Sequence, residues 1–280
     1  MSDASGNSAV SGLNEIIWER QVSFEENQIR LWHVGAARFW IRRTSGEWFV
    51  AFEPPNKDSS GSAETAHQLI VGREEAPPEG LQWTRYVAGD SNKIAVRPIL
   101  PDRPVVVRPI APVKVLSGRS VQYFIHIPVW LSITESADHA PLLLTEHPGL
   151  QMSSTWFGDP DNGELCYSLT AELVLSHVEL EGYPLAAICP LKISNLSPAI
   201  LDFQRVCVRV PYLHLYRGER FLSTNEVELT YRGPEQSQIS LQSRIPGFDR
   251  EIRHVSQPRV KVSRSIIKKS FELIRALSNY

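Results

Sequence analysis

The sequence lacks most of the features that would assign a chemistry to it. It contains only three cysteines and no CxxC pair, and it has no HExxH, GxSxG, GxGxxG or GxxxxGK motif, so none of the familiar cofactor or hydrolase signatures is present. No apolar run approaches the ~20 residues that a membrane-spanning helix requires. Residues 1–15 have neither the basic nor the apolar region of a signal peptide and are expected to form a disordered arm. Together with the sparse, odd-numbered cysteines, these absences predict a cytoplasmic protein that is not integral to a membrane.

Basic residues are concentrated at the C-terminal end. From residue 250 onward there are eight Lys and Arg residues and two Glu residues, a formal charge of +6, while the whole chain carries −2, so the rest of the chain carries −8. This acidic remainder, which has no basic and aromatic strand motif, argues against nucleic-acid binding. We therefore expect no nucleic-acid partner.

The C-terminal residues have the pattern of a basic amphipathic helix. Ile267, Phe271, Ile274 and Leu277 recur at helical spacing on one face. This face could pack on the protein's own sheet, on an anionic membrane surface peripheral to the inner membrane, or in a partner's groove. The candidate membrane-binding or partner-binding residues are Arg264, Lys268, Lys269, Phe271, Ile274 and Arg275.

Elsewhere the pattern is that of short strands. The 20 prolines and 16 glycines punctuate apolar runs, and every second residue from Val121 to Leu131 is apolar, as in a half-buried strand. The five prolines between residues 98 and 112 are expected at edge strands or strand starts. We predict an all-β fold: a small N-terminal β unit at 16–90, an antiparallel immunoglobulin-like β-sandwich at 97–245, and a basic tail with a helix at 246–280.

A predicted hairpin between Thr155 and Leu169 is the most distinctive segment. The turn at 158–163 precedes a strand in which Leu165, Tyr167 and Leu169 share one face, while Glu164, Cys166 and Ser168 share the other. The two aromatic residues before the turn could form an exposed ligand platform or plug the end of the core. The candidate functional surface comprises Trp156, Phe157, Asp159, Asp161 and Glu164.

The oxygen-rich turn of this hairpin suggests two chemistries, and neither is specific. Asp159, Asp161, Asn162 and Glu164 could hold calcium, but the spacing departs from the EF-hand loop, in which glycine occupies the sixth position rather than the fifth. With a distant histidine, the same carboxylates could serve a hydrolase as acid and base. The cysteines lie in strand-like runs and are expected to be small buried hydrophobes, and no histidine pair has the usual zinc spacing. We therefore assign no catalytic residue, metal or cofactor.

Several segments together resemble a known family. VQYFIHIPVWLSI, STWFGDPDNGELCYSL, AAICPLKISNLS and TNEVELTYRG, within about residues 97–233, are similar to a prokaryotic family catalogued as domain of unknown function number 432. The matched hairpin positions are Trp156, Phe157, Gly158, Asp159, Pro160, Gly163, Glu164, Cys166 and Tyr167. Many members of that family are encoded beside small-conductance mechanosensitive channels. The resemblance therefore implies an accessory role beside such a channel, and it supplies no catalytic residues. The hydrolase is the alternative.

Overall fold

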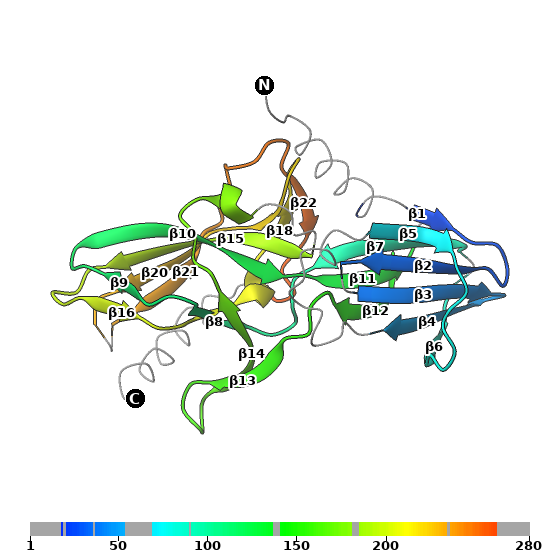
Figure 1. Cartoon of the computed structure of the whole chain (residues 1–280), viewed down its shortest axis with the longest axis horizontal. Helices are drawn as coiled ribbons and strands as arrows, with labels where there is room; N and C mark the ends of the chain where they lie inside the picture. Colours follow the sequence, from blue (N-terminus) through cyan, green and yellow to red (C-terminus); the bar gives the residue numbers. More distant parts are fainter. Residues whose placement is uncertain are drawn as a thin grey trace. The chain divides into compact units, whose positions relative to one another are not determined.

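The computed structural model describes residues 18, 21–35, 37–53, 69–89, 91–136, 141–180, 185–233 and 236–261. Within these ranges β-strands dominate, accompanied by the short 3₁₀ helices η1 (His177–Leu180) and η2 (Val210–Tyr212), which confirms the predicted all-β class (Figure 1). The predicted arm at 1–15 and the C-terminal helix with its six candidate residues lie outside the described residues. The immunoglobulin-like arrangement stays a prediction.

The chain forms two compact units that are not consecutive in sequence. Unit 1 contains Met1–Ile99, Pro128–Gln151 and Gly182–Ala186, and unit 2 contains Leu100–Ile127, Met152–Glu181 and Ala187–Tyr280. The chain therefore leaves unit 1, enters unit 2 and returns to unit 1 before unit 2 is completed.

Unit 1 contains two antiparallel sheets. The five-stranded sheet has the order β5 (Leu69–Glu74), β2 (Ile29–Val34), β3 (Ala37–Thr44), β4 (Glu47–Glu53), β6 (Trp83–Val87). The four-stranded sheet has the order β1 (Gln21–Ser23), β7 (Lys93–Ile99), β11 (Trp130–Glu135), β12 (Leu142–Pro148). The sheets touch where His147 of β12 stacks on Phe52 of β4, with ring centroids 4.1 Å apart.

Aromatic side chains form the core of unit 1. Trp32, Trp40 and Trp48 are at most 1% exposed. Phe24 meets the Trp48 ring edge-on at 5.1 Å, and Trp32 stacks on Phe39 at 5.6 Å. Each such ring buries about 150–250 Å², so these residues supply much of the apolar burial that stabilises this unit.

Unit 2 is assembled from three sheets. The seven-stranded sheet has the order β21 (Gln238–Leu241), β20 (Val227–Tyr231), β15 (Ala186–Asn195), β19 (Leu222–Thr224), β18 (Leu215–Arg217), β22 (Arg253–Ser256), with β10 (Arg119–Pro128) also paired to β15. The four-stranded sheet has the order β13 (Ser153–Phe157), β14 (Glu164–Ala171), β8 (Val105–Pro109), β17 (Val206–Val208). The two-stranded sheet pairs β16 (Leu201–Phe203) with β9 (Val113–Val115).

Three strand pairs of unit 2 are parallel, and this corrects the wholly antiparallel expectation. β14 runs parallel to β8, and β15 runs parallel to both β19 and β20. A parallel pair needs a long crossover connection. The chain supplies one between β8 and β14 by passing through β11 and β12 of unit 1. The hairpin pair β13 and β14 is antiparallel, as are the pairs of β8 with β17, β9 with β16, β18 with β19 and β22, and β20 with β21.

Candidate functional site

The predicted hairpin is present and lies at the edge of its sheet. β13 pairs antiparallel with β14, so that Trp156 faces Leu165 and Phe157 faces Glu164. β13 is the outermost strand of the four-stranded sheet, and Figure 1 shows the turn between the two strands projecting beyond the labelled strands of unit 2. An edge hairpin of this kind leaves one side of the ribbon available to another molecule.

Main-chain contacts and one indole fix the turn of the hairpin. Gly158 has a φ of 110°, which L side chains rarely adopt. The carbonyl of Asp159 accepts a hydrogen bond from the Gly163 amide at 2.7 Å and one from Nε1 of Trp156 at 3.0 Å. A Cβ atom at Gly163 would overlap the Trp156 ring. The WFGDP-x-x-G pattern is therefore explained by the shape of this turn.

The two faces of the hairpin differ in exposure. Phe157 and Cys166 are 3% and 0% exposed, whereas Trp156 and Leu165 are 50% and 45% exposed. Adjacent strand residues point to opposite faces, so Phe157 plugs the core while Trp156 faces outward. The face that carries Trp156 and Leu165 is thus the more exposed one. Alternation alone could not show which face the sheet buries.

The acidic residues of the turn do not converge. Asp159 and Asp161 are exposed, while the Glu164 carboxylate is held by Arg209, with Oε1 2.8 Å from Nη2 and Oε2 accepting from Nη1 at 3.0 Å. Within the described ranges, the one group of three or more potential metal-ligating residues includes Glu164 but neither aspartate. The hydrolase alternative therefore gains no support from the carboxylates of this turn.

Tyr167, the next aromatic residue of β14, is tied to the loop before β8. Its hydroxyl donates to Oδ1 of Asp102 at 2.8 Å, and the guanidinium of Arg103 lies 5.5 Å from the centre of its ring. Burial, followed by the hydrogen bond to Asp102, raises the pKa of Tyr167 to about 12. The phenol therefore stays protonated at neutral pH and serves as a structural donor.

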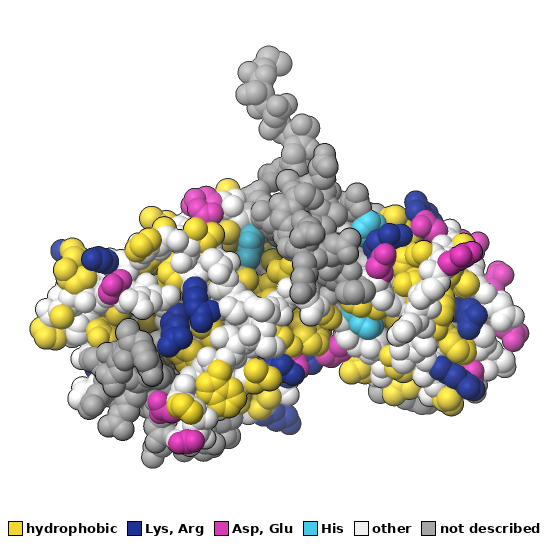
Figure 2. Space-filling model, turned by 60° about the horizontal axis from the view of Figure 1, so that its bottom comes forward, with side chains coloured by type: hydrophobic (Ala, Val, Ile, Leu, Met, Phe, Trp, Pro, Cys, Tyr) yellow, Lys and Arg dark blue, Asp and Glu magenta, His cyan; other side chains and the backbone are white. Residues whose placement is uncertain are grey.

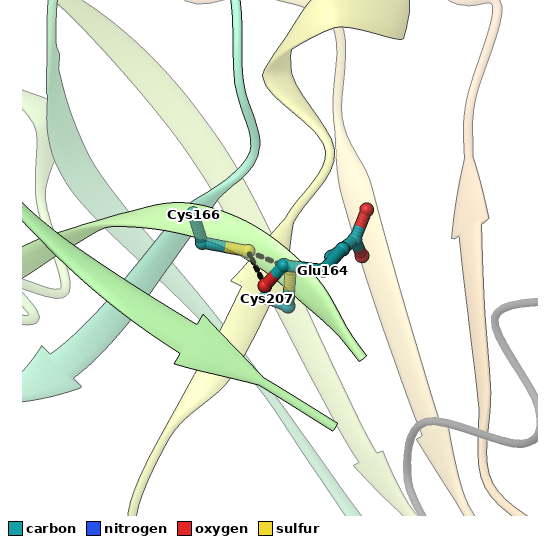
Figure 3. A group of neighbouring side chains, drawn as sticks. All are labelled: Glu164, Cys166 and Cys207. Atoms are coloured by element: carbon teal, nitrogen blue, oxygen red, sulfur yellow. Dashed lines mark hydrogen bonds between the residues drawn. The ribbon is translucent and has the colours of Figure 1, made fainter. Parts of the chain in front are cut away.

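Behind the hairpin lies a thiol cluster, defined here as Glu164, Cys166 and Cys207. The two sulfur atoms are 4.0 Å apart and point toward one another (Figure 3). Both cysteines are buried, packed with Val106 and Phe157. The contact with Cys166, followed by burial, raises the pKa of the Cys207 thiol well above its usual range. The prediction that the three cysteines are buried is confirmed, including Cys189 on β15.

Sequence reasoning missed the thiol cluster because its two cysteines are 41 residues apart. They meet because β14 and β17 both pair with β8, one on each side. Arg209, the partner of Glu164, was missed for the same reason. No short-range spacing in the sequence marks this neighbourhood.

A groove of about 450 Å³ opens on another face of unit 2. Its aromatic part includes Phe124 and Phe248, whose rings meet edge-on at 5.6 Å. In its polar part, Lys192 lies 2.9 Å from Glu228, which also accepts a hydrogen bond from Gln242 at 3.0 Å. These polar groups satisfy one another, so they indicate no ligand class.

The face shown in Figure 2 has no single dominant charge. In Figure 2, exposed hydrophobic side chains are interspersed with basic and acidic ones on the face shown. Among the described residues, no helix has the length and hydrophobicity needed to cross a lipid bilayer.

These features define a two-unit, all-β protein with a protruding hairpin backed by a buried thiol cluster. The sequence model of the family described as Protein of unknown function (DUF432) matches residues 17–275. The chain belongs to this family, as the resemblance of its central motifs predicted. No curated protein and no solved structure matches it.

Proposed function

We propose that this protein is a non-enzymatic interaction module that binds a membrane protein, such as a small-conductance mechanosensitive channel, through the outer face of the β13–β14 hairpin. The observation that carries the proposal is the cross-strand pair of Trp156 and Leu165. Both side chains are about half exposed although their strand neighbours Phe157 and Cys166 are buried. The proposal places the protein in the cytoplasm, peripheral to the inner membrane.

The hairpin has the chemistry of a protein-binding element. Tryptophan is enriched among the residues that dominate interface energetics, because it buries a large rigid surface with little loss of conformational entropy. The indole is already held by its hydrogen bond to the Asp159 carbonyl, so it would lose little conformational freedom on binding. The exposed Asp159 and Asp161 lie in the turn that joins Trp156 to Leu165. The complementary partner surface is therefore an apolar recess rimmed by basic groups.

Replacing either residue of the pair tests this proposal. We expect Trp156→Ala and Leu165→Ser each to weaken binding to the channel, reconstituted in lipid nanodiscs, with the tryptophan variant losing about 30-fold or more in Kd, as for a residue worth ~2 kcal/mol. Biolayer interferometry with the full-length protein measures the effect.

The controls separate contact from folding. Leu142→Ser, at a leucine of β12 that is 47% exposed, should bind as the wild type does. Trp156→Phe keeps an aromatic ring without the N–H donor, so it should retain more binding than Trp156→Ala if contact area matters. Wild-type affinity in both Trp156→Ala and Leu165→Ser would refute the role of the hairpin.

The basic C-terminal residues, which lie outside the described part of the chain, are the proposed second contact, with an anionic membrane surface. A chain ending at Lys261 lacks Arg264, Lys268, Lys269 and Arg275. At about 1 kcal/mol for each basic residue near the surface, we expect its partitioning to phosphatidylserine vesicles to fall by about 100-fold or more. Vesicle co-sedimentation measures this.

Two comparisons show whether the basic charge or the apolar side chains cause the membrane binding. Phe271→Ser with Ile274→Ser keeps the charge and removes two apolar groups, so its binding should stay salt-dependent. Vesicles of phosphatidylcholine alone should bind the wild type weakly. If the shortened chain binds anionic vesicles as the full chain does, the C-terminal residues are not a membrane contact.

A further inference from the structure

We propose that the thiol cluster is a binding site for Zn²⁺, with Cys166, Cys207 and Glu164 as its three protein ligands. This site is separate from the exposed face of the hairpin, and the inference does not depend on the proposed partner. It concerns the buried face of β14, together with Cys207 on β17.

The distances within the cluster are close to those of a zinc site. The potential ligand atoms of the three residues all lie within 4.8 Å of one another, and the two sulfur atoms are 4.0 Å apart. Zinc–sulfur bonds of about 2.3 Å in a tetrahedron place two sulfurs roughly 3.8 Å apart. The sulfurs therefore need almost no movement, and the carboxylate oxygen needs to approach by about 1 Å at most.

The strands hold these ligands in place. Cys166 lies on β14 and Cys207 on β17, and both strands are hydrogen-bonded to β8 between them. Glu164 is the first residue of β14, two positions before Cys166 and therefore on the same face. A site on paired strands has little freedom to collapse or open, which favours a defined coordination geometry.

The charges of the neighbourhood suit a divalent ion. Binding removes one proton from each thiol, both protons leave to solvent, and the two thiolates balance the two charges of Zn²⁺. The negative charge of Glu164 is already balanced by Arg209. A carboxylate oxygen has a second lone pair, so it can accept from Arg209 and still bind the metal. The guanidinium then orients the carboxylate, as outer partners of metal ligands commonly do.

The ligand set selects the kind of ion. Thiolates favour zinc and other soft or borderline cations, whereas Ca²⁺ and Mg²⁺ require oxygen ligands. The Glu164 side chain is 29% exposed, so the ion can enter from its side although both cysteines are buried. Three protein ligands leave a fourth position, which a solvent molecule can occupy on that side.

Titration of the full-length protein tests the proposal. Protein treated with a chelator and kept reduced should bind one Co²⁺ with a thiolate-to-metal charge-transfer absorption, and Zn²⁺ should displace it. In weakly buffered solution at neutral pH, each Zn²⁺ should release about two protons. Both readouts use the wild-type protein, so they do not depend on how a variant folds.

Variants identify the ligands. Cys166→Ser and Cys207→Ser should each abolish the charge-transfer band, and Glu164→Gln should weaken binding about 10-fold or more. Cys189→Ser removes the third buried cysteine and should bind as the wild type does. The proposal is overturned if the wild-type protein gives neither the band nor proton release, or if the band survives the first two substitutions.

Discussion

Replacing Asn195 with alanine is expected to lower the free energy of unfolding by about 4 kcal/mol, since it removes the partner of the buried Val115 carbonyl and of the buried Ser197 amide, at ~1–3 kcal/mol each. Asn195 ends β15 and is fully buried. Its Nδ2 donates to the carbonyls of Val115 and Ala199, both at 2.8 Å. Its Oδ1 accepts from the amide and the hydroxyl of Ser197, at 3.0 and 2.7 Å.

The amide of Asn195 thus uses its entire hydrogen-bonding capacity. It joins the end of β9 to the loop at 197–199, which leads into β16, the strand paired with β9, so its loss affects both segments. Urea unfolding followed by tryptophan fluorescence measures the change.

Two further variants sharpen this test. Asn195→Asp keeps the shape but loses both donors and sets a carboxylate against two carbonyl oxygens, so it should be at least as destabilising as alanine. Asn162→Ala, at the exposed turn of the hairpin, should change stability by less than about 0.5 kcal/mol. A loss below about 1 kcal/mol in Asn195→Ala would show that water replaces these bonds.

Stability is expected to fall between about pH 6.5 and pH 4 because of His147. Burial lowers the pKa of His147 from 6.5 to about 4, so the folded protein keeps the ring neutral while the unfolded chain binds a proton below pH 6.5. The unfolded state then binds more protons, so the stabilisation present above pH 6.5 is lost as the pH falls toward 4. At about 1.4 kcal/mol for each pH unit, and allowing for partial exposure of the ring, the loss is about 2–3 kcal/mol.

His147→Gln isolates this contribution. Glutamine does not titrate, so the variant should lose less stability than the wild type between pH 7 and pH 4. Other histidines remain, and burial also lowers the pKa of His33 and His126, so the variant keeps part of the acid sensitivity. His33→Gln is the matched control at a less buried ring. Parallel pH profiles for the wild type and His147→Gln would contradict the assignment.

The local elements of the fold could be predicted from the sequence. The alternation from Val121 leads to β10, with Ile125 and Ile127 fully buried, although the strand ends at Pro128 and Leu131 belongs to β11 of another sheet. Pro104 and Pro112 stand directly before β8 and β9, as expected for strand starts. Pro98 and Pro109 are exceptions. Pro98 lies within β7, which pairs with both β1 and β11, and Pro109 ends β8, which lies between β14 and β17. Pro98 is tolerated since the pairing of β7 with β1 extends only to Ala95, so β1 does not reach Pro98.

Pairings between distant segments could not be predicted. The parallel contacts of β15 depend on strands that follow it after several turns, and alternation within one strand does not specify its neighbours. The same limit applies to the site. The turn and its aromatic pair could be predicted from neighbouring residues. The contacts of Cys166 with Cys207 and of Glu164 with Arg209 could not, because they depend on the register of β17 against β8.

The interleaved order of the two units constrains how the chain can fold during synthesis. β7 of unit 1 pairs with β11, which begins only at Trp130, and the unit also includes residues up to Ala186. A nascent chain that has reached Ile99 therefore exposes an unpaired strand edge, the kind of surface that promotes aggregation. Unit 1 cannot complete its fold on the ribosome until part of unit 2 has been translated. The two units are therefore expected to fold together rather than one after the other.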